Sequence, residues 1–174
     1  TNAVLPDDSC LFSFDDGVGT GVNGNGYLRY VIKENSNAHN LFELASAGGN
    51  SVLTASPGLG GTSVHVVCVY DPADGQQAVY TNGVLMASQP ASLALSNVST
   101  NSAALGRSPW YNDGDPWLAG SITEFRIYSG RLLPSDVAAT DKIGPNYLLM
   151  PTLSVVASGG EINLSWPTNY SSPS

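Results

Sequence analysis

Short runs of strand-forming residues recur along the chain at intervals of roughly 8 to 15 residues, and each is followed by a turn signal. Helical periodicity, in which apolar residues recur every three or four positions, is nearly absent. Many short strands separated by turns are typical of an antiparallel sandwich or barrel, so the chain is predicted to be all-β. The clearest runs are 11–14, 27–33, 40–45, 51–55, 64–70, 78–81, 84–88, 103–106 and 122–129.

The most specific local signal is Asn82-Gly83, which stands between the alternating runs 78–81 and 84–88. A type I′ turn needs two consecutive residues with positive φ, and an Asn-Gly pair supplies both, so the pair predicts a hairpin. The run 64–70 precedes this hairpin through a tight turn and is apolar on both faces, as is typical of a strand inside a packed layer. We therefore expect a three-stranded meander over 64–88.

One segment, 135–142, predicts a short helix. Pro134 precedes it, Ser135 is placed to cap its start, and Gly144-Pro145 follows its end. A helix of a turn or two is expected to cover a surface of the sandwich rather than to form part of its framework.

The chain starts a new pattern after residue 147. Residues 152–157 and 162–166 both alternate between apolar and polar, and the turn signal at 158–160 lies between them, so a second hairpin is expected. A two-stranded hairpin is marginal in water by itself. We therefore divide the chain into a domain over 1–147 and a segment of linker and hairpin over 148–174. That segment either docks on the domain, opens a further module or pairs with another chain.

The charge of the chain excludes some partners. It carries 6 Lys+Arg against 14 Asp+Glu, a net charge of −8, and its cations are scattered. A nucleic-acid partner would need a concentrated basic face, so none is expected. No apolar run approaches the roughly 20 residues of a membrane span. Few charges among many Ser, Thr, Asn and Gly residues are common in extracellular proteins. We expect a secreted or cell-surface location, with any signal peptide removed or the chain cut from a longer one.

Several motifs follow one another in the second half of the chain. They are the strand from Val64 to Asp71 with His65 at its start, the hairpin 78–88, the triplet Leu105-Gly106-Arg107, the segment 118–128 and the short helix after it. In this order they resemble, over 64–145, the laminin-G-like domains of the concanavalin A-like lectins. The resemblance implies a jelly roll of two antiparallel sheets, with one short helix near 135–142.

The sequence departs from the family pattern at several points. Thr62-Ser63 replaces a tryptophan that usually precedes the strand histidine, and Thr123 stands where the family has an aspartate. The run 11–17 resembles a strand from well inside such a domain, which implies that the opening strands are missing from this chain. Because missing strands leave sheet edges open, we expect another segment to complete the sandwich.

Three aromatic residues gather in one predicted loop: Trp110, Tyr111 and Trp117. Exposed aromatic rings have an apolar face on which a sugar can stack, and Trp and Tyr add a polar group. A lectin-like fold implies carbohydrate as the organic partner, so these three residues are the candidate ligand-binding residues. The alternative is that some of them cover an edge of the sandwich.

The same loop carries Asn112, Asp113 and Asp115, and a second acidic pair, Asp15 and Asp16, lies near the start of the chain. Calcium takes about six to eight oxygen ligands from carboxylates, amides and carbonyls. Laminin-G-like domains often bind calcium through such loop residues. The resemblance therefore makes calcium the expected cofactor, with these five residues as its candidate ligands. The alternative is a solvated acidic loop.

The chain has two cysteines, Cys10 and Cys68, and both lie in apolar strand-like runs. They are either two buried thiols that act as small apolar side chains or, in a secreted protein, a disulfide between strands. Nothing near them would stabilise a thiolate, so a catalytic thiol is not expected.

Catalysis is not expected either. A glycosidase needs two carboxylates that flank the scissile bond, and on one strand these would follow an E-x-D spacing. None of the four glutamates begins such a pair: Glu34, Glu43, Glu124 and Glu161. The two histidines, His39 and His65, have no G-x-S-x-G motif to serve.

Together these features predict a non-catalytic extracellular module that recognises a glycan or a protein through its rim loops, with calcium as organiser. The alternative is a structural subunit of a filament or surface layer, in which a strand from a neighbouring copy completes the open sandwich. A glycoside hydrolase is disfavoured because paired carboxylates are absent from the sequence.

Overall fold

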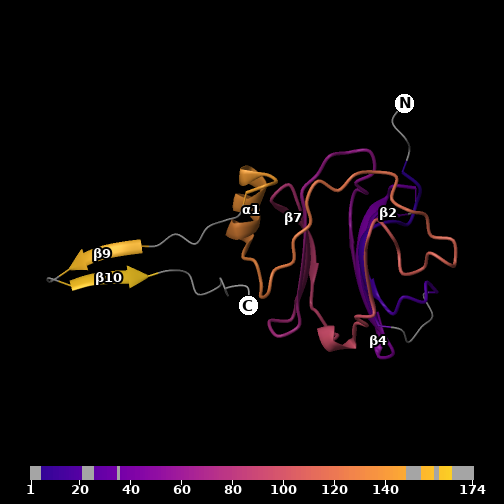
Figure 1. Cartoon of the computed structure of the whole chain (residues 1–174), viewed down its shortest axis with the longest axis horizontal. Coiled ribbons are helices and arrows are strands. Elements are labelled where there is room, and N and C mark those ends of the chain that lie inside the picture. Colours follow the sequence, from indigo (N-terminus) through magenta and orange to yellow (C-terminus); the bar gives the residue numbers. More distant parts are fainter. Residues whose placement is uncertain (1–4, 21–25, 35, 148–153, 159–160, 166–174) are drawn as a thin grey trace.

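The computed structural model describes residues 5–20, 26–34, 36–147, 154–158 and 161–165. Two antiparallel sheets face each other (Figure 1). The five-stranded sheet has the order β4-β3-β2-β1-β8 and the three-stranded sheet the order β5-β6-β7. This arrangement confirms the predicted all-β, two-sheet jelly roll with a short helix. The elements of the large sheet are β1 (Ser9–Asp15), β2 (Tyr27–Glu34), β3 (His39–Ser46), β4 (Gly49–Ala55) and β8 (Ser102–Leu105). Those of the small sheet are β5 (Val66–Asp71), β6 (Gln76–Thr81) and β7 (Val84–Gln89), and a 3₁₀ turn, η1 (Leu95–Asn97), follows them.

Strand alternation separates the two faces of the five-stranded sheet. Tyr30 pairs with Phe42 and both rings point into the sandwich, whereas the next pair, Arg29 with Glu43, points out of it. The main core joins both sheets and is completed by loop residues; its fully packed members are Leu5, Tyr30, Ile32, Phe42, Leu53, Leu59 and Val79.

One buried polar bridge joins the sheets inside this apolar core. Gln77 of β6 is fully buried, accepts a hydrogen bond from the Ser51 hydroxyl (2.6 Å) and donates one to the Phe42 carbonyl (2.8 Å). A buried amide without partners would cost free energy, and these bonds remove that cost. The pairing also fixes how β6 lies over β3 and β4.

The predicted meander and its turn are confirmed. β5, β6 and β7 pair in sequence, and Asn82 (φ 48°) and Gly83 (φ 76°) form the turn between β6 and β7. The turn needs left-handed backbone at both positions, which Asn and Gly adopt with little strain.

The predicted helix is α1 (Pro134–Ile143), which lies beside the three-stranded sheet on the side away from the large sheet (Figure 1). Its Val137 is buried against Val69, Ala78 and Tyr80, so the helix covers the outer face of β5 and β6. Ser135 does not cap it, contrary to our expectation. Leu133 is the N-cap residue, and the Asp136 carboxylate accepts a hydrogen bond from its backbone N–H (3.1 Å). No helix in the described part of the chain is long and apolar enough to cross a membrane.

The second predicted hairpin is present as β9 (Ser154–Ser158) and β10 (Glu161–Ser165), which form a two-stranded sheet of their own. Val155 pairs with Leu164 in its register. Residues 152–153 and 166 of the prediction lie outside the described residues. The division of the chain at 147/148 stays a prediction.

One predicted strand, 122–129, is wrong. Residues 119–133 contain no strand, although the segment alternates as a strand would. A strand needs a hydrogen-bonded neighbour, and this segment has none among the described residues. Its Ile127 side chain is 71% exposed, and Phe125 and Tyr128 are also exposed.

Candidate functional site

The loop over 106–118 lies on the outer face of the five-stranded sheet. Both of its ends are tied down, because the Gly106 N–H donates to the Leu11 carbonyl (2.8 Å) and the Leu118 N–H donates to the Gly106 carbonyl (2.9 Å). Between these points Ser108 and Pro109 are buried and residues 112–114 are exposed. The loop is therefore held by the sheet at its ends and presents its middle to solvent.

Arg29 of β2 joins the loop to the sheet. Its Nε lies 2.9 Å from Glu43 Oε2 and its Nη1 lies 3.3 Å from Asp115 Oδ2, and its side chain is only 12% exposed. The Ser108 hydroxyl donates to the same Asp115 oxygen (2.5 Å). Burial by itself would lower the pKa of Arg29, but the Glu43 carboxylate together with Tyr27 and Cys10 more than offsets this, and the pKa is raised. The Arg29 guanidinium therefore stays positively charged, and the carboxylates of Glu43 and Asp115 balance that charge.

The aromatic residues of the loop do different things. Trp110 is half-buried, packs edge-on against Tyr27 (ring centroids 6.3 Å apart) and lies 5.5 Å from the Arg29 guanidinium. Trp117 is 67% exposed. The sequence left open whether these rings bind a ligand or cover the sandwich. Trp110 covers the sheet, whereas the Trp117 ring is exposed and can contact a ligand.

The Tyr111 ring packs against a second arginine, Arg107. The Arg107 guanidinium lies 4.5 Å above the Tyr111 ring, and its Nη2 donates to the Ser102 hydroxyl (2.7 Å). No carboxylate pairs with Arg107 among the ion pairs of the described residues. The loop thus holds one arginine with two acidic partners and one with an aromatic partner.

The loop over 17–19 closes the same end of the site. The Tyr111 hydroxyl donates to the Gly17 carbonyl (3.1 Å) and Asn112 Nδ2 donates to the Val18 carbonyl (2.8 Å). Gly19 has φ +80°, and a Cβ there would collide with the Tyr111 ring. A glycine is required for this close approach.

The five candidate calcium ligands come into one region but do not converge. Asp15 is buried and accepts from the Ser13 hydroxyl and the Gly17 N–H (both 2.8 Å), while Asp115 is engaged by Arg29. Asp16 accepts from the Val18 N–H (2.9 Å), and Asp113 is exposed. Within the ranges that the structure describes, no three His, Cys, Asp or Glu side chains form a group that could hold a metal ion. Calcium stays a prediction.

Both cysteines are free thiols in the structure. Cys10 Sγ lies 3.3 Å from the Tyr30 carbonyl and is fully buried, and burial raises its pKa to about 12. Burial also raises the pKa of the Cys68 thiol, still further. Both are held in the unreactive protonated form.

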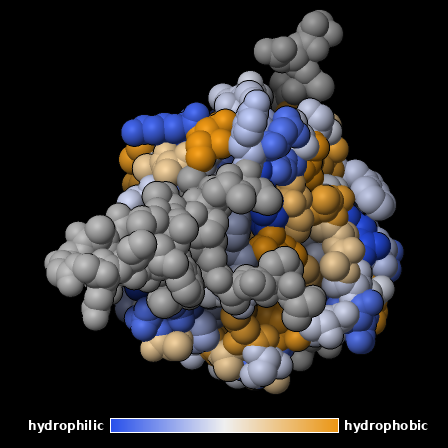
Figure 2. All heavy atoms as spheres, turned by 60° about the vertical axis from the view of Figure 1, so that its left-hand side comes forward, coloured by the Kyte–Doolittle hydropathy of each residue, from blue (hydrophilic) through white to orange (hydrophobic). Residues whose placement is uncertain are grey.

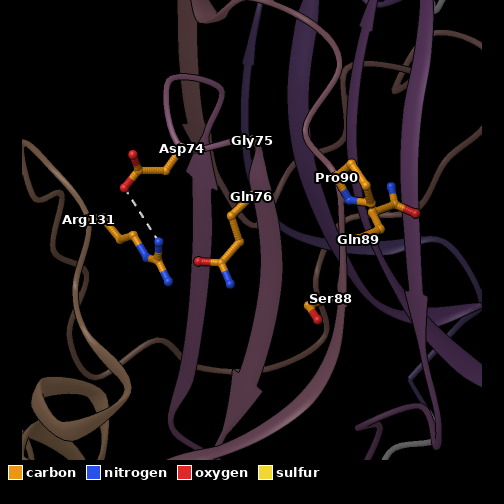
Figure 3. Close-up of a pocket in the computed structure, with 7 residues that line it drawn as sticks. All are labelled: Asp74, Gly75, Gln76, Ser88, Gln89, Pro90 and Arg131. Carbon is orange, nitrogen blue, oxygen red and sulfur yellow. Dashed lines mark hydrogen bonds and ion pairs between the residues drawn. The ribbon is translucent and has the colours of Figure 1, made fainter.

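A hollow lies at the end of the small sheet where β5 turns into β6 and β7 ends (Figure 3). It has a volume of about 360 Å³, and Arg131 faces Asp74 across one side at 3.5 Å. No aromatic ring lines it, so it lacks a stacking platform for a sugar. Nothing in the sequence pointed to it. Its lining residues are Asp74, Gly75, Gln76, Ser88, Gln89, Pro90 and Arg131.

Comparison with known families identifies the domain. The family model described as the concanavalin A-like lectin/glucanases superfamily matches residues 3–138. The chain belongs to this superfamily. The match begins at residue 3, well before the stretch 64–145 on which the sequence resemblance rested, and covers that stretch as far as residue 138, so it confirms the resemblance. A comparison with curated protein sequences found no significant match.

Solved structures similar to the chain include carbohydrate-binding modules. The CBM40 module of the Ruminococcus gnavus IT-sialidase bound to α2,3-sialyllactose has 21% identity and a TM-score of 0.61, over 79% of this chain and 74% of that one. The same module with α2,6-sialyllactose has 21% identity and a TM-score of 0.46, over 62% and 58%. An S-layer domain-containing protein of Clostridium thermocellum has 21% identity and a TM-score of 0.38, over 80% and 63%. The first of these likenesses supports the jelly-roll fold.

Proposed function

We propose that the domain is a non-catalytic glycan-binding module whose site is the loop 106–118 on the outer face of the five-stranded sheet. The observation that carries this proposal is that some residues of the loop hold it on the sheet while one of its aromatic rings stays exposed. Trp110 and Asp115 fasten it to the sheet through Tyr27 and Arg29, which leaves Trp117 with a free ring. A sugar needs an exposed aromatic ring for stacking, and a loop whose backbone is already fastened loses little conformational entropy on binding.

The charges favour an acidic sugar. Arg29 has no charge to offer a ligand, because Glu43 and Asp115 already pair with it. Among the described residues the partners of Arg107 are neutral, namely the Tyr111 ring and the Ser102 hydroxyl. An arginine binds a carboxylate with two parallel hydrogen bonds, so a sugar carboxylate fits at Arg107. The similar CBM40 module was solved with sialyllactose, a sugar of this acidic kind.

Isothermal titration calorimetry tests the proposal with α2,3-sialyllactose and lactose as the two probes. We expect heat of binding with sialyllactose that is lost in Trp117→Ala and kept in Tyr147→Ala, a control that also removes an exposed aromatic ring. Arg107→Gln is expected to reduce binding of sialyllactose to the level of lactose. If neither sugar binds, or if Trp117→Ala binds as well as wild type, the proposal is wrong.

The absence of catalysis is part of this proposal. Several carboxylates that would have to act are engaged elsewhere: Glu43 with Arg29, Glu34 with His39 (2.7 Å) and Glu124 with Arg126 (2.6 Å). Incubation with polysaccharides should release no reducing sugar. A secreted or cell-surface location is the setting that a glycan-binding module with few charges fits, and calcium is proposed as an organiser of the exposed part of the loop around Asp113.

A further inference from the structure

The segment 122–129 has an uncovered inner side. Arg126 contacts both Glu124 (Nε–Oε1 2.7 Å) and Tyr128 (Nη1–Oη 3.4 Å), which places alternate side chains on one side of an extended chain. Phe125 lies on the other side, and the centroid of its half-exposed ring is 5.6 Å from that of Phe12, which packs against the main core. Ile127 shares the side of Phe125 by the same alternation and is nevertheless 71% exposed.

β5 is the neighbouring edge of the small sheet. It pairs only with β6 in the described sheet, so the backbone groups of its other side are open. Its residues Val66, Cys68 and Tyr70 pack against the main core. On the face shown in Figure 2 apolar and polar residues are mixed, and the exposed apolar residues of the segment include Phe125 and Ile127.

The segment and β5 run in the same direction. Arg131, after the segment, is 3.5 Å from Asp74, which follows β5. At the other end, Glu124 accepts a hydrogen bond from the Asn146 N–H (3.0 Å) just after α1. Asp141 of α1 lies 3.4 Å from His65, which precedes β5. No backbone hydrogen bond joins the segment to β5 among the described residues. One antiparallel strand placed between two chains that run in the same direction would bond to both of them.

We propose that this slot between β5 and the segment 122–129 accepts β10 (Glu161–Ser165) from a second copy of the chain. β10 is five residues long against the six of β5. In its sequence Ile162 and Leu164 alternate with polar residues, as a strand with one face on a core requires. Antiparallel insertion places Glu161, the single charged residue of the hairpin, at the end of the slot where Arg131 lies.

The hairpin itself also favours insertion. β10 now has one hydrogen-bonded neighbour, β9, in an isolated two-stranded sheet, which is marginal in water. In the slot it would have two neighbours. In its own chain β10 lies away from the slot, in the hairpin with β9 that projects from the domain (Figure 1). Donation from copy to copy produces open chains.

Sedimentation velocity of the full chain tests the proposal through one donor variant and one acceptor variant. Asn163→Pro removes a strand N–H in β10, and Asn163→Thr is its matched control. Ile127→Lys places a charge in the slot at an exposed position, and Leu85→Lys does the same at an exposed apolar position on β7. We expect wild type and both controls to form oligomers that grow with concentration, and both variants to remain monomers with unchanged melting temperatures.

Mixing the two variants gives the sharpest outcome. Asn163→Pro keeps an intact slot and Ile127→Lys keeps an intact β10, so an equimolar mixture should form one-to-one dimers that do not grow further. A wild-type chain that stays monomeric at every concentration overturns the proposal. So do oligomers that survive in either variant, or a mixture that stays monomeric. None of these results depends on glycan binding, which the calorimetry measures separately.

Discussion

The ion pair beneath the loop makes a quantitative prediction. Glu43→Gln keeps the shape of the side chain but removes its charge from Arg29, at a position where the Glu43 side chain is 7% exposed. Removing one partner of a buried ion pair costs about 3–5 kcal/mol. Asp115 stays 3.3 Å from Arg29, so the lower end of this range applies, about 3 kcal/mol. For a chain of this length that corresponds to a fall in melting temperature of about 6–12 °C.

Thermal and urea unfolding followed by circular dichroism measure this loss. The matched control is Asp74→Asn, which removes one charge from an ion pair on the surface, where such pairs contribute about 0–1 kcal/mol. If Glu43→Gln unfolds like this control, Arg29 is not the anchor of the loop and the reasoning from burial fails.

Three further predictions concern the surroundings of the site. Cys10, which is fully buried, should not react with a thiol reagent at neutral pH in the folded protein and should react fully in denaturant, because burial raises its thiol pKa to about 12; labelling of Cys10 in the folded state, located by peptide mass spectrometry, would show that the core opens. Gly19→Ala should lower the melting temperature more than Gly61→Ala, because both have nearly the same positive φ (80° and 78°) but only at Gly19 would the new methyl meet Tyr111; equal losses would mean that the loop yields freely. Calcium should raise the melting temperature of chelator-treated protein, and Asp113→Ala should remove that effect; no heat of binding and no shift in melting temperature would end the calcium proposal.

Local signals in the sequence were enough to predict much of the fold. The turn at Asn82-Gly83 depends on backbone conformations that these two residues favour, so it could be recognised without knowledge of the rest of the chain. The helix after Pro134 was recognisable for the same reason. Its cap was not: the helix begins at Pro134, one residue earlier than expected, so Leu133 rather than Ser135 is the N-cap residue and Asp136 accepts the hydrogen bond from the Leu133 N–H.

The features that the sequence did not reveal depend on partners far away in the chain. Arg29 and Asp115 are 86 residues apart, and no local pattern joins them. Trp110 and Trp117 look alike in the sequence. Their different roles depend on the sheet beneath the loop, against which Trp110 packs while Trp117 stays exposed. The run 122–129 alternates correctly for a strand, but pairing requires a neighbour, and none of the described strands supplies it.

Nitrogen–proton correlation NMR gives the most direct test of the binding site, because the chain has three tryptophans and each gives its own indole N–H signal. Titration with α2,3-sialyllactose is predicted to shift the Trp117 indole signal most, together with the Arg107 side chain and the backbone over 111–117. Shifts confined to the hollow around Arg131 and Asp74, or no shift of the Trp117 signal while the sugar binds, would contradict the placement of the glycan site on this loop.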